Sequence, residues 1–237
     1  MEQSGAEHDL RELMRRGVSL DFRPQGALAD LPLRRSSVLI LFGVLDRIPA
    51  DSASGHTPGS AAGLPAAVPP DLDLLLTRRA DGMRHHPGQI AFPGGGAEPE
   101  DADAAATALR EASEETGLDP GGVEVLGALP EVHIPVSNNL VTPVVGWWRS
   151  PSEVAADRTE SVEVFRVPVA ELLDPAARGT SVLRRAGLSH RGAAFRLSPR
   201  LGGHIVWGFT GILLAGLFDE LGWGGPWDPE QTFPVRA

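Results

Sequence analysis

Residues 94–117 read GGGAEPEDADAAATALREASEETG. A glycine-rich turn opens this stretch, and an alanine-rich segment follows it and predicts a helix from about Ala102 to Thr116. Gly117 is well placed as the C-cap of that helix. The rest of the sequence is interpreted outward from this turn and helix.

Three glutamates occupy the last turns of the predicted helix. Positions three and four apart share a helix face, so the carboxylates of Glu111, Glu114 and Glu115 converge. Like charges on one patch repel, and a bound divalent cation removes that penalty. Hard oxygen donors with no Cys or His beside them suit Mg²⁺ or Mn²⁺ better than zinc. Arg110 is expected to hold one carboxylate by a bidentate ion pair.

A solvated acidic helix face is the alternative, because most charge runs have that role. The glycine turn argues against it. Gly94 and Gly95 leave backbone close to the acidic face, as a site that handles phosphate groups requires. The spacing therefore favours a metal–phosphate site over a solvated face.

The segment Arg110–Leu118 resembles the second half of the Nudix box, the motif of hydrolases that split nucleoside diphosphates linked to another group. The usual first half is a glycine, five residues, a glutamate and seven residues. Counted from Gly96, the glutamate position falls on Ala102; counted from Gly95, it falls on Asp101, one residue out of step. The role of Asp101 is therefore open, whereas the three glutamates keep their places.

Residues 75–95 read LLTRRADGMRHHPGQIAFPGG. They resemble the segment that marks coenzyme A pyrophosphatases within the Nudix superfamily, in which Leu-Leu-Thr-x-Arg, a later Arg, a Gly and Phe-Pro-Gly-Gly precede the box. The shifted box with an aspartate also resembles that branch. The resemblance implies metal-dependent hydrolysis of coenzyme A, or a derivative, to 3′,5′-ADP and 4′-phosphopantetheine.

The charge of the chain bears on such a substrate. The formal net charge is −10, and every one of the 21 cationic side chains is arginine. An acidic protein that binds an acidic substrate must concentrate positive charge locally. Arg78, Arg79 and Arg84 supply such a patch, although strand alternation predicts that one of the adjacent pair faces solvent. The neighbouring residues 85 and 86, both histidine, are expected to pack in the loop and not to act in catalysis.

The resemblance also implies a catalytic set. Ions held by the three helix glutamates would neutralise charge on the pyrophosphate, and Arg110 belongs to the same site. One or two further acids complete the metal set from a downstream loop in this family. Glu160 is the first candidate for that role, and Glu163 is the second, with a strand-surface role favoured for Glu163.

Composition predicts a soluble enzyme. The chain has no cysteine, so disulfides and thiolate chemistry are excluded, and 42% hydrophobic residues suffice for a substantial core. The polar N-terminus lacks a secretory signal pattern, so a cytoplasmic location is expected. The apolar run 205–218 is too short to cross a bilayer. We expect a small-molecule substrate, no nucleic-acid or membrane partner, and the sequence leaves the oligomeric state open.

The pattern of elements predicts an α/β fold, an α/β/α sandwich with a mixed sheet and a loop–helix–loop metal site. One domain is expected over residues 1–237, with residues 48–70 as a surface insertion rich in Pro, Ala, Ser and Gly. Helices are expected at 7–16, 102–116, 169–173 and 204–221. Strands are expected at 36–44, 71–77, 89–92, 123–129, 140–148 and 163–167, with a hairpin around 183–197.

Other functions remain open on sequence alone. The substrate could be ADP-ribose, a dinucleotide or an oxidised nucleotide. The chain could also be a non-catalytic Nudix module that senses a nucleotide, but its Arg-Glu-x-x-Glu-Glu core is intact and it has no basic recognition helix. Trp147, Trp148 and Trp207 are expected in the core more than on an adenine ring.

Overall fold

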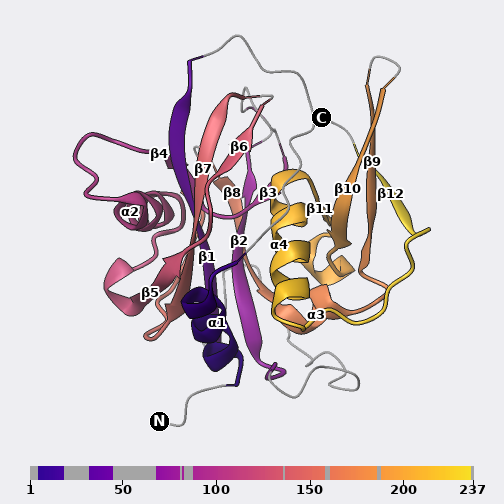
Figure 1. Ribbon diagram of the computed structural model, residues 1–237, viewed down its shortest axis with the longest axis horizontal. Helices are drawn as coiled ribbons and strands as arrows, with labels where there is room; N and C mark the ends of the chain where they lie inside the picture. The colour runs from indigo at the N-terminus through magenta and orange to yellow at the C-terminus, as the bar shows by residue number, and fades with distance from the viewer. Residues whose placement is uncertain are drawn as a thin grey trace.

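The computed structural model describes residues 5–18, 32–44, 68–80, 82, 88–135, 137–157, 161–185 and 188–235, excluding the side chains of residues 185 and 188. An eight-stranded mixed sheet forms the centre of the described part of the molecule (Figure 1). Its main path is β3 (Ile90–Ala91), β2 (Leu72–Arg79), β1 (Arg34–Val44), β7 (Asn139–Trp148) and β5 (Val123–Ala128). The long apolar run in β1 is buried on both faces, as its sequence predicts.

Three further strands pair with this path. β4 (Gly94–Gly96) pairs with β1, β6 (Val132–Ile134) with β7, and β8 (Ser161–Pro168) with β2. The β1–β7 pair is parallel, and the other pairs of this sheet are antiparallel. The predicted strands are confirmed with small changes of boundary, whereas β4 and β6 are additional.

Helices cover both faces of the sheet, which confirms the predicted α/β/α arrangement (Figure 1). On one face, α2 (Ala104–Thr116) packs Ala108 and Ala112 against Leu39 and Leu41 of β1. On the other face lie α1 (Gly5–Arg16) and α4 (Gly208–Glu220), in one apolar cluster with the alternate β1 side chains. Alternation along β1 thus assigns each helix to its face. The short helix α3 (Val169–Leu173) follows β8 as predicted.

A second, four-stranded sheet flanks α4 and was not predicted. Its order is β11 (Ile205–Val206), β10 (Leu188–Arg196), β9 (Arg178–Arg185) and β12 (Thr232–Val235). The predicted hairpin is confirmed as β9–β10, but it is longer than expected. The final helix does not begin at residue 204 as predicted, because Ile205 and Val206 pair with β10 first. In Figure 1, α4 lies between the two sheets, which explains why it is apolar on nearly every side.

The predicted insertion falls largely outside the described residues. Of the predicted insertion, residues 48–67 lie outside them, and Val68 at its end is buried in the core. The single domain stays a prediction. Within the described residues, the structure contains no helix that is both long and apolar enough to span a membrane.

Candidate active site

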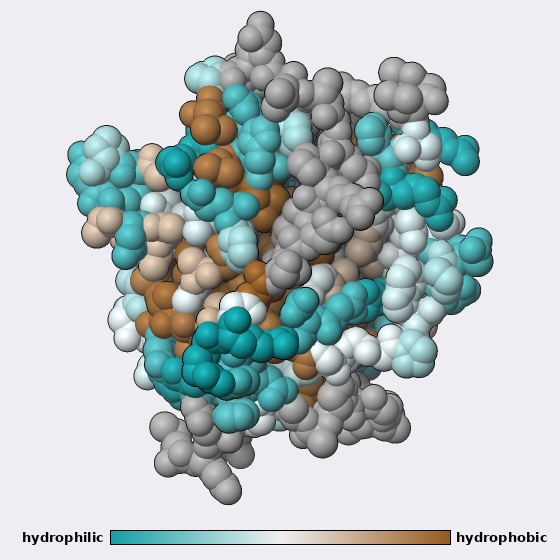
Figure 2. Space-filling model, in the orientation of Figure 1, coloured by the Kyte–Doolittle hydropathy of each residue, from teal (hydrophilic) through white to brown (hydrophobic). Residues whose placement is uncertain are grey.

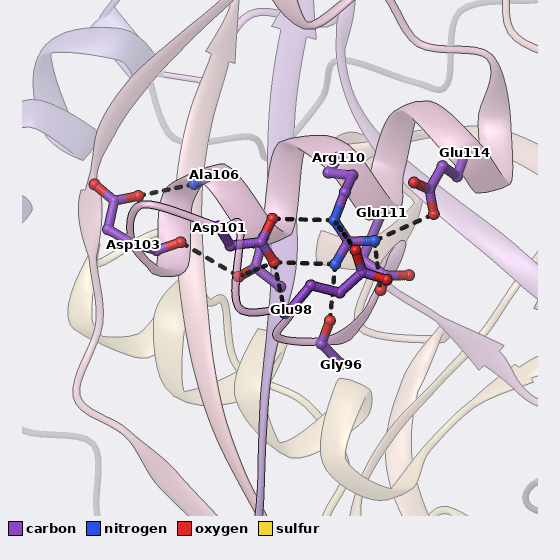
Figure 3. Close-up of polar contacts among 9 residues, drawn as sticks. Gly96, Glu98, Asp101, Asp103, Ala106, Arg110, Glu111 and Glu114 are labelled. Atoms are coloured by element: carbon purple, nitrogen blue, oxygen red, sulfur yellow. Dashed lines mark hydrogen bonds and ion pairs between the residues drawn. The ribbon is translucent and has the colours of Figure 1, made fainter.

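The acidic helix α2 has a defined start and end. Asp103 is its N-cap, and its side chain accepts a hydrogen bond from the backbone N–H of Ala106 at 2.8 Å (Figure 3). Gly117 ends the helix in the left-handed conformation, with φ of 67°, and its N–H donates to the carbonyl of Ser113. The predicted C-cap is confirmed, and the helix begins two residues later than predicted because Asp103 caps it.

Asp101 and Arg110 join the preceding loop to this helix. The Nε of Arg110 donates to Oδ1 of Asp101 at 3.0 Å, and its Nη2 donates to Oδ2 at 3.1 Å (Figure 3). Asp101 also accepts from the backbone N–H of Glu98 and from the hydroxyl of Thr107, both at 2.9 Å. These bonds, above all those from Arg110, lower the pKa of the Asp101 carboxyl below its ordinary value. Arg110 therefore makes a bidentate pair, but with Asp101 and not with one of the helix glutamates, for which the sequence predicted it.

Arg110 also contacts two of the three predicted metal ligands. Its Nη1 donates to Oε1 of Glu111 at 3.1 Å and to Oε2 of Glu114 at 3.2 Å, and its Nη2 donates to the carbonyl of Gly96 at 2.8 Å. Figure 3 shows the guanidinium between these acceptors. The positive charge of Arg110 thus offsets the repulsion between carboxylates that the sequence predicts for this patch.

The glycine turn lies directly against the other side of the acidic patch. The N–H of Gly94 donates to Oε2 of Glu115 at 3.3 Å, and Glu115 is buried. A Cβ on Gly95 would lie 2.3 Å from Oε2 of Glu111, and one on Gly94 would lie 2.3 Å from the carbonyl of Ser37. Only glycine fits at position 94, where φ is 157° and the obstacle is backbone, and a side chain at position 95 would displace the Glu111 carboxylate. The close approach expected from the sequence is therefore present.

The donors fit a hard divalent cation in their chemistry. Glu111 and Glu115 are four residues apart on α2 and both approach the glycine turn, whereas the Glu114 side chain is 60% exposed and paired with Arg110. In the described segments, no three acidic or histidine side chains gather closely enough to hold one ion. To complete a set of metal ligands, Glu114 would have to leave Arg110 and bind the ion, or another residue would have to supply the missing ligand. Glu160, the predicted fourth ligand, lies outside the described residues.

The two strand arginines at the end of β2 differ in their surroundings. Counted along β2 from Leu75, Arg79 has the parity of the sheet face that α2 covers, and Arg78 has the parity of the opposite face. The register of the β2–β8 pair shifts between these two arginines. Arg78 donates to Oε1 of Glu163 at 3.2 Å, whereas the Nε of Arg79 is buried and finds no hydrogen-bond acceptor among the described residues. The sequence predicted that one arginine of the pair faces solvent, but both are partly buried, and the Arg78 side chain is only 19% exposed.

Several other predictions have clear outcomes. Trp147 and Trp148 are buried, as expected for core residues, and the Arg166 guanidinium lies 5.1 Å from the Trp148 ring centre. Glu163 has the strand-surface role that the sequence favoured, with the ring of His204 3.8 Å from its second oxygen. Residues 84–86, which carry the third arginine and the two loop histidines, lie outside the described residues.

Two structural roles at the site were not predicted from the sequence. Asp103 caps α2, and an aspartate directly before an alanine-rich run is a signal that could have identified it. The partner of Asp101 was also missed. The contact with Arg110 depends on the path of the loop between them, and no local pattern encodes that path.

The chain is similar to several known proteins. A model of the NUDIX domain matches residues 58–186. "Uncharacterized Nudix hydrolase NudL" of Photorhabdus laumondii is 34% identical over 173 residues, covering 73% of this chain and 90% of that protein. The protein of the same name from Escherichia coli K12 is 39% identical over 158 residues, covering 67% and 78%. A solved structure, the Nudix hydrolase RenU of M. smegmatis, covers 63% of this chain and 83% of its own, with 21% identity and a TM-score of 0.43.

Proposed function

Because the chain belongs to the Nudix hydrolase family, we propose that it hydrolyses the pyrophosphate of coenzyme A or a derivative, yielding 3′,5′-ADP and 4′-phosphopantetheine. The family acts on small-molecule substrates and generally uses divalent metals such as Mg²⁺ or Mn²⁺. The finer assignment concerns the substrate, the metal ligands and the residues that recognise the nucleotide.

The continuity of residues 75–95 with the acidic helix carries the proposal. This segment runs through β2 and β3 into the glycine turn, and the turn lies against Glu111 and Glu115. A segment that resembles the coenzyme A branch thus ends at the carboxylates that would perform the chemistry. Arg78 and Arg79 are the last two residues of β2 in the same hairpin, where β2 pairs with β3.

The metal would be held by the three helix glutamates and one downstream acid, namely Glu111, Glu114, Glu115 and Glu160. When bound, such an ion makes water a better nucleophile and neutralises charge on the pyrophosphate oxygens. Arg110 keeps the carboxylates in place, and its pair with Asp101 anchors it to the loop. Positioning and electrostatics then account for most of the rate, because phosphoryl chemistry asks little covalent work of the protein.

The glycine turn and the arginines supply the substrate contacts in this proposal. Gly94 and Gly95 place no side chain between the pyrophosphate and the carboxylates. Arg79, on the same sheet face as α2, is suited to a phosphate oxygen because its planar fork matches that geometry. Arg78 and Arg84 are the other proposed substrate contacts, and Arg84 is the candidate for the 3′-phosphate.

A substrate panel tests the proposal. Coenzyme A, dephospho-coenzyme A, ADP-ribose and NADH would be compared by kcat/KM with Mg²⁺ and with Mn²⁺. The proposal expects the highest value for coenzyme A, and expects Arg84→Ala to weaken coenzyme A more than dephospho-coenzyme A. A higher kcat/KM for ADP-ribose or NADH would assign another substrate. A flat panel with no metal-dependent cleavage would favour the non-catalytic module.

A further inference from the structure

Positive charge is segregated within this acidic chain. Residues 175–218 contain six arginines, two histidines and no acidic residue. The remaining residues hold the other 15 arginines and all 31 acidic side chains, so a segment of formal charge +6 is set against a remainder of −16. This segment forms β9, β10, β11 and most of α4, so the charge is concentrated largely in the second sheet.

The hairpin β9–β10 presents part of this charge to solvent. Arg184 lies opposite Ser189, and Arg191 lies opposite Val182, so the two arginines share one face of the hairpin as diagonal neighbours. Both are exposed, as is Arg200 beyond the end of β10. Within β9, the two terminal nitrogens of Arg178 pair with Asp219 at 2.8 Å each. Two arginines on one exposed face make that face of the hairpin positively charged.

The hairpin adjoins the candidate substrate segment. β10 pairs with β11, and His204, directly before β11, lies 3.8 Å from Glu163, the partner of Arg78. β11 in turn lies against β3. Figure 2 shows hydrophilic surface along the side of the molecule that this hairpin forms. The basic hairpin and the β2–β3 hairpin are therefore neighbours at one end of the fold.

We propose that the β9–β10 hairpin attracts the anionic substrate electrostatically and raises its concentration at the β2–β3 hairpin. The inference rests on the proposed function in one respect, which is that the substrate carries several phosphate charges. A chain of charge −10 repels such a molecule at long range, and a local basic surface offsets that repulsion. Direct contact between the hairpin arginines and the bound substrate is not required.

The distance from the hairpin arginines to β11 predicts the salt range in which the electrostatic attraction operates. Arg191 lies five residues from Arg196, where β10 meets β11, or about 17 Å at a strand rise of about 3.3 Å per residue. The Debye length is about 30 Å at 0.01 M salt and about 8 Å at 0.15 M. The field of the hairpin reaches the substrate segment at low salt and is largely screened at 0.15 M.

The test compares two double variants that change the net charge equally. Arg184→Gln/Arg191→Gln removes charge from the hairpin, and Arg15→Gln/Arg16→Gln removes it from the exposed end of α1. Steady-state kinetics would be measured from 0.01 to 0.15 M salt, with gel filtration of each variant. We expect the hairpin variant to lose about threefold or more in kcat/KM at 0.01 M salt, with kcat unchanged and the loss fading by 0.15 M. The α1 variant should follow the wild-type protein.

Three results would overturn the inference. An equal loss in both variants would show that only net charge matters, and a loss that persists at 0.15 M salt would indicate a short-range role. A changed elution volume for the hairpin variant would instead assign these arginines to self-association. If the panel identifies another nucleoside diphosphate derivative as the substrate, the proposed function fails, and the salt experiment proceeds with that substrate. The two failures are thereby distinguishable.

Discussion

Arg110 and Asp101 are joined by two hydrogen bonds, Nε to Oδ1 at 3.0 Å and Nη2 to Oδ2 at 3.1 Å. This bidentate pair ties the loop after the glycine turn to the middle of α2. The same guanidinium contacts Glu111 and Glu114, so the loop, the cation and the proposed metal ligands form one connected unit. Asp101 is therefore placed as a structural anchor of the site, which explains why an aspartate one residue out of step is compatible with this box.

The first prediction concerns acid stability. Because Arg110 and the accompanying donors lower the pKa of Asp101 below its ordinary value of 3.8, its ionised form stabilises the folded state. That contribution is fully present above the pKa of the unfolded chain and is lost as the pH falls below about 4. Asp101→Asn should lower Tm by a constant amount between pH 6 and 8, and the gap to wild type should narrow below about pH 4. A gap that stays constant down to pH 3 would contradict this linkage.

Gly95 provides a test of the turn against the carboxylates. A Cβ at Gly95 would meet the Glu111 carboxylate at 2.3 Å, whereas one at Gly96 would meet nothing within 4 Å. Gly95→Ala should displace Glu111 and reduce kcat by about 100-fold, the effect of a misplacement of about 1 Å. Gly96→Ala is the matched control and should change stability by no more than about 0.5 kcal/mol. Similar activity in the two variants would remove Glu111 from the site.

Glu114 tests the assignment of the metal ligands. Its side chain is 60% exposed, so its pair with Arg110 contributes little to stability. Glu114→Gln should lower kcat by about 100-fold or more through loss of a metal ligand, with Tm within about 2 °C of wild type. Glu100→Gln, an exposed residue of the preceding loop, removes the same charge and should retain activity. A wild-type rate for Glu114→Gln would show that the metal assignment is wrong.

The two strand arginines should separate in their effects on substrate binding. Arg79 lies on the sheet face of α2 with a buried Nε, and Arg78 is paired with Glu163 on the other face. We expect Arg79→Gln to raise KM about tenfold, the value of one charge-assisted contact of about 1.4 kcal/mol. Arg78→Gln should raise KM less. Equal increases, or the reverse order, would contradict the assignment of faces.

A buried ion pair holds β2 to β8 away from the proposed chemistry. The Nε of Arg166 donates to Oδ2 of Asp73 at 2.5 Å, and both side chains are at most 3% exposed. Asp73→Asn leaves the arginine charge buried and unbalanced, and should cost about 3–5 kcal/mol of unfolding free energy. Glu131→Gln breaks the exposed pair with Arg35 and should cost no more than about 1 kcal/mol. Urea unfolding of both variants measures the contrast, and equal costs would contradict it.

The sequence predicted the central sheet and α2 because their signals are local. Each signal lies within about a dozen residues of sequence: an apolar run predicts β1, and an alanine-rich stretch followed by Gly117 predicts α2 and its end. The second sheet carries weaker signals. Ile205 and Val206 were assigned to the final helix because a short apolar run does not distinguish a buried strand from a helix start. Only their pairing with β10 decides between the two.

The candidate site shows the same division between features set by local sequence and features set by tertiary contacts. Helical spacing, which is a local property, predicted that the three glutamates converge on one helix face. In the structure Glu111 and Glu115 approach the glycine turn, whereas Glu114 is 60% exposed and paired with Arg110. The pairing of Arg110 with Asp101 was not found, because it depends on the path of the intervening loop. The opposite faces of Arg78 and Arg79 follow from alternation, but which face α2 covers is a tertiary fact. The helical position of these side chains was therefore easier to predict from the sequence than their hydrogen-bond partners.

Product analysis with coenzyme A tests the central claim most directly. The purified protein would be incubated with coenzyme A and Mg²⁺ or Mn²⁺, with a chelator control, and the products resolved by chromatography. The account predicts equal amounts of 3′,5′-ADP and 4′-phosphopantetheine, formed only when the metal is present. Intact coenzyme A after prolonged incubation with either metal would contradict it, as would cleavage at any bond other than the pyrophosphate.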